Sequence, residues 1–170
     1  MRNHILLASV LLAVFAGSAG AGSNKPNAEV FFDFDSARLS ADAQAKLDAT
    51  ALDAKQAIGA KIVISGHTDP VGSSVYNVKL SIRRAEGVRD QLLAQGVDPD
   101  DIVMAYFGED GPRRGTFAQD RRVSVELTRD PLYVVIDNAQ AGAATAITWR
   151  RPATTAEIEG FQPTEQTARR

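Results

Sequence analysis

Apolar residues recur along the chain with two different periods, and these periods predict its secondary structure. Four short segments have the β-branched and aromatic composition typical of strands, namely residues 29–35, 61–66, 101–107 and 121–127. Two longer segments carry apolar residues at helical spacing, namely residues 41–58 and 74–95. Ser40 is a candidate N-cap, and Gly59 and Gly96 are the helix stop signals. Helices placed between strands favour a sheet covered by helices on one face.

The N-terminus has the pattern of a secretory signal peptide. Arg2 provides a positive charge, residues 5–15 are apolar, and Ala19-Gly20-Ala21 matches a small-residue cleavage site. We expect residues 1–21 to be removed after Ala21 and residues 22–28 to form a short lead. A retained membrane anchor is the alternative, although the apolar run is shorter than the roughly 20 residues of a membrane span.

Residues 129–170 differ in character from the rest of the chain. The segments 131–136 and 146–149 are apolar and β-prone, and they predict an added hairpin. Residues 150–170 combine prolines and threonines with few apolar residues, which is typical of a disordered tail. This extension is either a tolerated addition or a docking segment for another envelope protein.

Charge and composition exclude several function classes. The chain has 19 basic and 21 acidic residues, for a net charge of −2. Binding to nucleic acid through phosphate contacts favours a basic surface, so we expect no nucleic-acid partner. The absence of cysteine excludes disulfides, thiolate metal sites, cysteine nucleophiles and the attachment point of a lipoprotein anchor.

The helix over residues 74–95 places its two arginines differently. At 100° per residue, one arc collects the core-facing residues Val78, Ser81, Ala85, Val88 and Leu92. Arg83 lies about 160° from Ala85 and should be solvated. Arg84 lies on the border of the core, within about 20° of Asn77. Arg84 and Asn77 are therefore expected to form one polar edge beside the sheet.

A carboxylate is expected near that polar edge. Asp69 follows the second predicted strand and precedes the second helix. Ligands of α/β proteins bind where strands end and helices begin, so Asp69 and Arg84 predict a site with two opposite charges. The alternative is that Asp69 caps a turn while Arg84 forms a surface salt bridge.

The residues around this site resemble a known family. The segment GHTDPVGSSVYNVKLSIRRAEGV resembles the signature of OmpA-like peptidoglycan-binding domains. The resemblance extends to VFFDFDSARLS, YFGEDGP and DRRVSVEL and covers residues 29–128 in four ordered blocks. It implies an α+β two-layer sandwich, βαβαββ-like, with a mixed four-stranded sheet.

The resemblance also implies a function without catalysis and without a cofactor. Such domains hold the peptide stem of peptidoglycan, at a meso-diaminopimelate whose side chain ends in an ammonium and a carboxylate on one carbon. By motif position, Asp69 resembles the acceptor for the ammonium and Arg84 the partner of the carboxylate. Thr68, Asn77 and Asp35 resemble further polar contacts. We therefore expect a periplasmic protein associated with the cell wall or outer membrane.

One position departs from the family pattern. Asp120 stands where the family usually has asparagine before the final pair of arginines. Either it lines the pocket and weakens carboxylate binding, or it caps the loop or neutralises Arg114. Strand parity places Arg121, rather than Arg122, toward the site. A pocket altered by Asp120 would favour a second function, an envelope protein-interaction module that keeps the fold without binding the wall.

Other chemistry has weaker support in the sequence. His67 lies near Ser65 and Asp69, but neighbouring strand residues point to opposite faces, so a hydrolase triad is not favoured. Asp33 shares a strand face with Asp35, yet no third carboxylate follows at metal-binding spacing. We therefore expect neither catalysis nor a metal site.

Overall fold

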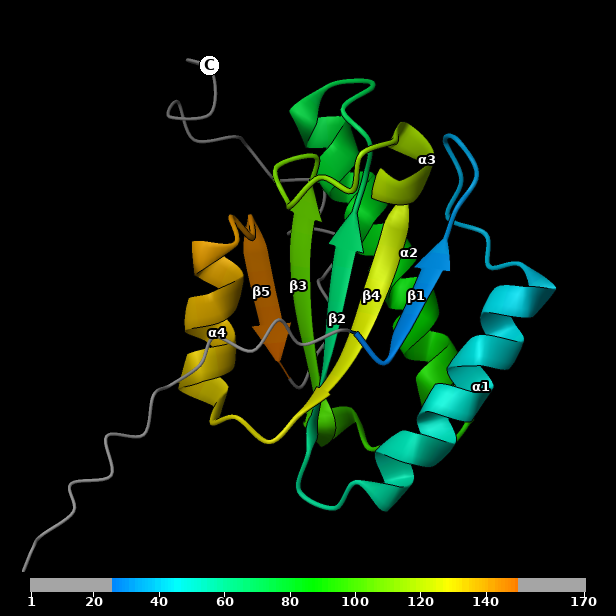
Figure 1. Ribbon diagram of the computed structural model, residues 1–170, viewed down its shortest axis with the longest axis vertical. Helices are drawn as coiled ribbons and strands as arrows, with labels where there is room; N and C mark the ends of the chain where they lie inside the picture. The colour runs from blue at the N-terminus through cyan, green and yellow to red at the C-terminus, as the bar shows by residue number, and fades with distance from the viewer. Residues whose placement is uncertain (1–25, 150–170) are drawn as a thin grey trace, which may run out of the picture.

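The computed structural model describes residues 26–149, which form one sheet with helices on both sides (Figure 1). The predicted signal peptide, most of the lead and the predicted tail lie outside the described residues. The strands are β1 (Ala28–Phe31), β2 (Lys61–His67), β3 (Ile102–Gly108), β4 (Arg122–Thr128) and β5 (Ala146–Trp149). The helices are α1 (Ala41–Gln56), α2 (Ser74–Ala94), α3 (Phe117–Asp120) and α4 (Leu132–Ala141), with a 3-10 turn at Pro99–Asp101. No helix among these residues is long and apolar enough to cross a membrane.

The sheet is mixed, as predicted, but it has five strands in the order β1-β4-β2-β3-β5. The parallel pair is β2 with β3, because α2 connects them as a crossover helix. The pairs β1–β4, β2–β4 and β3–β5 are antiparallel. The predicted α+β fold with helices packed on a sheet is therefore confirmed, and the fifth strand is an addition.

Both long helices begin and pack as the sequence pattern predicts. The Ser40 hydroxyl accepts a hydrogen bond from the Ala43 amide at the start of α1. All five predicted core residues of α2 are buried. Four of them, all except Ser81, join residues of α1 and of the sheet in the main core, which includes Leu47, Ile64, Met104 and Val125. The first helix is shorter than the predicted segment 41–58: Ile58 lies beyond the end of α1 and is 89% exposed.

The predicted C-terminal hairpin is also wrong. Residues Leu132–Ala141 form the helix α4, and only Ala146–Trp149 form a strand. Val135 and Ala139, one helical turn apart, are the buried residues of α4. These two residues form an apolar stripe on the side of α4 that faces the sheet. The free energy gained by burying this stripe exceeds the strand preference of the β-branched residues around Val134. Strand composition alone cannot reveal that stripe.

Helix α4 covers the face of the sheet opposite α1 and α2, so the expectation that helices cover one face only was wrong. Along β3, Met104 and Tyr106 join the main core, whereas Ala105 and Phe107 pack with Ala139 of α4. Successive residues of a strand point to opposite faces, so the two clusters lie on the two sides of the sheet. The extension thus closes the second face at the β3–β5 edge (Figure 1).

Candidate functional site

A small cavity gathers most of the charges predicted for the site. Its volume is about 20 Å³, which is room for about one water molecule. The residues lining it are Phe34, Asp35, Asp69, Val71, Tyr76, Asn77, Leu80, Arg84 and Arg121. Five of the six predicted site residues are in this set, and only Thr68 is not. A larger groove of about 260 Å³ between α4 and the sheet is lined by Glu126 and Asp130 but by no basic residue.

Asp69 is held at the end of β2 by two interactions. One carboxylate oxygen accepts a hydrogen bond from the Val71 amide at 3.1 Å, which is the turn-capping role considered above. The other oxygen pairs with an Arg121 terminal nitrogen at 3.1 Å. Arg121 also donates from Nε to the Phe32 carbonyl oxygen at 3.1 Å. Asp69 is thus a buried acceptor whose position is fixed before any ligand binds.

Arg84 is more deeply buried than the helical wheel predicts, with 0% of its surface exposed. Its three nitrogens donate to the carbonyl oxygens of Ser36, His67 and Asp33, at 2.8, 3.1 and 3.2 Å. Its guanidinium also lies over the Phe32 ring, 5.1 Å from the centroid. Burial lowers the pKa of Arg84 to about 10, partly offset by the nearby negative charge of Asp69.

The donors of Arg84 are only partly used. A guanidinium has five N–H groups, and the three contacts above occupy one N–H on each nitrogen. One N–H therefore remains on each terminal nitrogen. Arg84 makes no ion pair with a carboxylate of residues 26–149. A buried cation with two free donors is suited to a bidentate carboxylate.

The close approach of β2 to α2 brings Arg84 to this place. A Cβ atom at Gly66 would collide with the carbonyl oxygen of Ser81, so only glycine allows this contact. Thr68 follows β2 and ties it to the end of β3, because its amide donates to the Gly108 carbonyl oxygen at 2.7 Å. The Thr68 hydroxyl is buried and has no hydrogen-bond partner within the described part of the chain. Thr68 is therefore buried next to Asp69 in the chain but does not line the cavity.

The rim of the cavity is formed by the loop after β1 and by the first turn of α2. The Tyr76 hydroxyl donates a hydrogen bond to Asp35, whose φ is 55°. That bond raises the pKa of Tyr76. Phe34 and Val71 complete an exposed apolar rim. Arg83 is exposed, as predicted, but its guanidinium lies 5.7 Å from the Tyr76 ring centroid, which the wheel did not reveal.

Asn77 brings a partner that the sequence reasoning missed. Its side-chain nitrogen donates to a Glu109 carboxylate oxygen, and the other oxygen of Glu109 accepts from the Ser74 hydroxyl at 2.7 Å. Glu109 lies in the loop after β3 and does not line the cavity. The only signal for it in the sequence was the glycine-glutamate pair of the YFGEDGP block, to which no role was assigned.

The sequence model of the OmpA family matches residues 31–125, more than half of the chain. The chain belongs to the OmpA family. This match contains the cavity and all six predicted site residues, and it ends before α4 and β5. The family assignment from the four sequence blocks is therefore confirmed.

Similar proteins come from several bacteria. Outer membrane protein P5 of Haemophilus influenzae is 36% identical over 115 residues, which are 59% of this chain and 33% of that protein. A peptidoglycan-associated lipoprotein of Pseudomonas aeruginosa is 36% identical over 101 residues, which are 56% of this chain and 60% of that protein. The chain thus spans 33% to 60% of the length of these two relatives.

Solved structures share the fold of this OmpA-family domain. The crystal structure of the peptidoglycan-associated lipoprotein from Burkholderia pseudomallei is 33% identical with a TM-score of 0.53, and covers 61% of this chain and 91% of that one. The C-terminal domain of Helicobacter pylori MotB has a TM-score of 0.56 at 19% identity, covering 67% of this chain and 95% of that one. The latter identity supports a common fold only.

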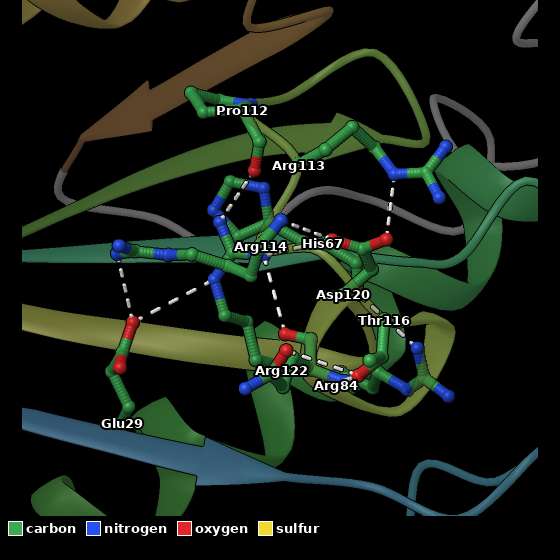
Figure 2. Close-up of polar contacts among 10 residues, drawn as sticks. Glu29, His67, Arg84, Pro112, Arg113, Arg114, Thr116, Asp120 and Arg122 are labelled. Carbon is green, nitrogen blue, oxygen red and sulfur yellow. Dashed lines mark hydrogen bonds and ion pairs between the residues drawn. The ribbon is translucent and has the colours of Figure 1, made fainter.

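Asp120, the departure from the family pattern, caps a loop and does not line the cavity. It is 1% exposed. Its two oxygens accept from Nε of Arg113 at 2.6 Å and from the Arg114 amide at 2.7 Å (Figure 2). The capping alternative is the one observed, but the ion pairs of Asp120 are with Arg113 and, at 3.8 Å, with Arg122. The Arg114 side chain turns instead to Glu29 at 3.0 Å.

Arg122 and His67 lie under the same loop (Figure 2). Arg122 donates to the Pro112 carbonyl oxygen at 3.0 Å, so it is Arg121 that reaches the cavity, as strand parity predicts. His67 stacks on Phe107 with ring centroids 4.6 Å apart. Burial, with the charges of Arg122 and Arg114, lowers the pKa of His67 to about 3.

These surroundings leave His67 without a catalytic partner. Its Nδ1 has no hydrogen-bond partner among residues 26–149, and Asp69 is bound to Val71 and Arg121 instead. A triad needs a base that is hydrogen-bonded to both nucleophile and acid. Within the described residues there is also no group of three or more acidic or histidine side chains placed to hold a metal.

Proposed function

We propose that this OmpA-family domain binds peptidoglycan without catalysing a reaction, through the meso-diaminopimelate of the stem peptide. The observation that carries the proposal is the meeting of a buried carboxylate, Asp69, with a buried arginine, Arg84, at one cavity. The diaminopimelate side chain ends in an ammonium and a carboxylate on one carbon. Asp69 would accept from the ammonium, and the two free donors of Arg84 would bind the carboxylate.

Arg121 completes this arrangement. Before a ligand binds, it neutralises Asp69 and so keeps a buried acid from being left unpaired. A ligand ammonium would take its place at Asp69, and Arg121 would then be available to the ligand carboxylate. The cavity holds about one water molecule, so the link between Asp35 and Tyr76 must open for the side chain to enter.

The relatives support a place in the bacterial envelope. Two similar proteins are named peptidoglycan-associated lipoproteins and another an outer membrane protein. We propose a periplasmic protein that tethers or senses the wall. The alternative of a domain that binds envelope proteins but not the wall rested on a pocket altered by Asp120, and Asp120 lies outside the cavity wall.

Ligand choice tests this proposal. Lysine-type stem peptides keep the side-chain ammonium and lack the adjacent carboxylate. We expect calorimetry to show about 30- to 150-fold tighter binding of the diaminopimelate-type peptide, because a lost contact to a charged group costs about 2–3 kcal/mol. The mature protein should also sediment with purified sacculi and release no soluble muropeptides.

An Asp69→Asn variant tests the binding of the ligand ammonium separately from the binding of its carboxylate. It removes the partner of the ammonium, which both peptides carry, and keeps an oxygen that can accept from the Val71 amide. Both affinities should therefore fall by about tenfold or more while their ratio is retained. Asp90→Asn is the matched control, because Asp90 is an exposed acid on α2 away from the cavity. Equal binding of the two peptides by the wild-type protein would contradict the role of Arg84.

A further inference from the structure

Glu109 holds the first turn of α2 from a loop that is distant in sequence. Its two carboxylate oxygens are both used: one accepts from the Ser74 hydroxyl at 2.7 Å and the other from the Asn77 side-chain nitrogen. Glu109 is half-buried, whereas Asn77 is only 1% exposed. The contact with Asn77 therefore lies at the inner end of the carboxylate, next to the cavity that Asn77 lines.

This contact determines which end of the Asn77 amide faces the cavity. An asparagine side chain can present either its NH₂ group or its oxygen in a given direction. An ionised carboxylate only accepts hydrogen bonds, so Glu109 requires the NH₂ group of Asn77 to face it. The Asn77 oxygen then points away from Glu109 and lies beside Gly72, where a Cβ atom would be 3.6 Å from it, next to Val71, which lines the cavity.

We propose that Glu109 is a positioning residue that sets the hydrogen-bond polarity of the binding cavity. By holding the NH₂ group of Asn77, it presents the Asn77 oxygen to the ligand as a second acceptor beside Asp69. Two acceptors suit an ammonium, which has three donors and no acceptor. Without Glu109 the amide is free to turn and to offer a donor, which would repel the ammonium. This inference rests on the proposed function and explains how an uncharged residue favours a cationic group.

A merely structural role for Glu109 makes a different prediction. If Glu109 only ties the loop after β3 to α2, its loss should weaken every ligand by the same factor. If it orients Asn77, its loss should weaken a ligand with a free ammonium more than the same ligand with that ammonium blocked. The ratio of the two affinities therefore distinguishes the roles, whereas stability does not.

The experiment uses a diaminopimelate-type stem peptide and the same peptide acetylated on the side-chain amine. Both are titrated by calorimetry into the wild-type protein, Glu109→Gln and Asp110→Asn. Glutamine has the shape of glutamate but can also donate, so it no longer selects one orientation of Asn77. Asp110→Asn removes the same charge from an exposed neighbour in the same loop.

We expect Glu109→Gln to lower the preference for the free amine by about tenfold or more, the value of one hydrogen bond to a charged group. Asp110→Asn should change this preference by less than about twofold, since an exposed charge is screened. In an Asn77→Ala background, Glu109→Gln should no longer change the preference. Equal losses for the two peptides, or an equal change in Asp110→Asn, would overturn the inference.

A second measurement tests the orientation without a ligand. In the wild-type protein, the side-chain NH₂ protons of Asn77 should exchange with solvent slowly, because Glu109 binds them. Glu109→Gln should speed this exchange by about tenfold or more, and an unchanged rate would overturn the inference. If the wild-type protein binds neither peptide, the proposed function fails, and the exchange rate still shows whether Glu109 holds the NH₂ group of Asn77.

Discussion

Arg84 should stabilise the fold as well as bind a ligand. Replacing it tests whether its contacts with three carbonyl oxygens hold the site together. Its side chain ties the loop after β1 to β2 through three carbonyl oxygens. A hydrogen bond to a charged group contributes about 1.5–3 kcal/mol, so three would contribute at least about 4.5 kcal/mol. The pKa lowered to about 10 shows that burial opposes the charge. We therefore expect Arg84→Ala to lower the free energy of unfolding by about 3 kcal/mol.

The matched control is its neighbour on the same helix. Arg83 is exposed, contacts the Tyr76 ring and forms no ion pair within residues 26–149, so Arg83→Ala should cost about 0–1 kcal/mol. Arg84→Lys should fall between the two, because a compact ammonium keeps the charge but cannot reach all three carbonyl oxygens. Urea titration followed by circular dichroism measures the free energy of unfolding of all three variants. In thermal unfolding, the melting temperature of Arg84→Ala should be about 10 °C lower than that of the wild-type protein.

The lower stability expected for Arg84→Ala limits the temperature at which its binding can be measured. Arg84→Ala should retain at least part of the stability of a small domain, which is about 5–15 kcal/mol. Sacculus binding should therefore be compared at a temperature where circular dichroism shows each variant to be folded. If Arg84→Ala is no less stable than Arg83→Ala, the three carbonyl contacts do not hold the loop, and the reasoning is refuted.

Two further predictions concern the loop that covers His67. The pKa of His67 is about 3 in the folded state and about 6.5 when unfolded, so the unfolded chain binds the extra proton between these values and stability falls as pH decreases from 6.5 to 3. Between pH 7 and pH 5 the wild-type protein should lose about 2 kcal/mol more than His67→Gln in urea titrations, and equal losses would contradict a buried neutral His67. Asp120→Asn should cost about 2 kcal/mol, because it removes a buried charge that pairs with Arg113 and lies 3.8 Å from the buried Arg122. Peptide affinity should stay within about threefold, and tenfold tighter binding would instead place Asp120 at the ligand.

Much of the site follows from local sequence rules. The spacing of seven residues between Asn77 and Arg84 places both on one side of any helix, and both line the cavity. The position of Asp69 between a strand and a helix brings its carboxylate to the same place. Strand parity likewise selected Arg121 over Arg122. These predictions hold because helices and strands repeat with fixed periods whatever surrounds them.

Other features depend on contacts that no local rule contains. Two of the three carbonyl partners of Arg84 come from the loop after β1, 48 and 51 residues away. Glu109 meets Asn77 only because the parallel pairing of β2 and β3 brings their carboxyl ends together. The sequence left open whether Asp120 lines the pocket or caps the loop, and it did not predict the partner Arg113. The conformation of a loop depends on the residues against which it packs.

The sequence by itself determined the family, the two long helices, four of the five strands and the pair of opposite charges, since these depend on periodicity and on motifs of fixed spacing. Only the tertiary structure decided that residues 132–141 are helical, because the apolar stripe of Val135 and Ala139 gains more by burial against the sheet than its β-branched residues gain as a strand. It alone decided the complete burial of Arg84, because a wheel gives the direction of a side chain but not the loop that closes over it.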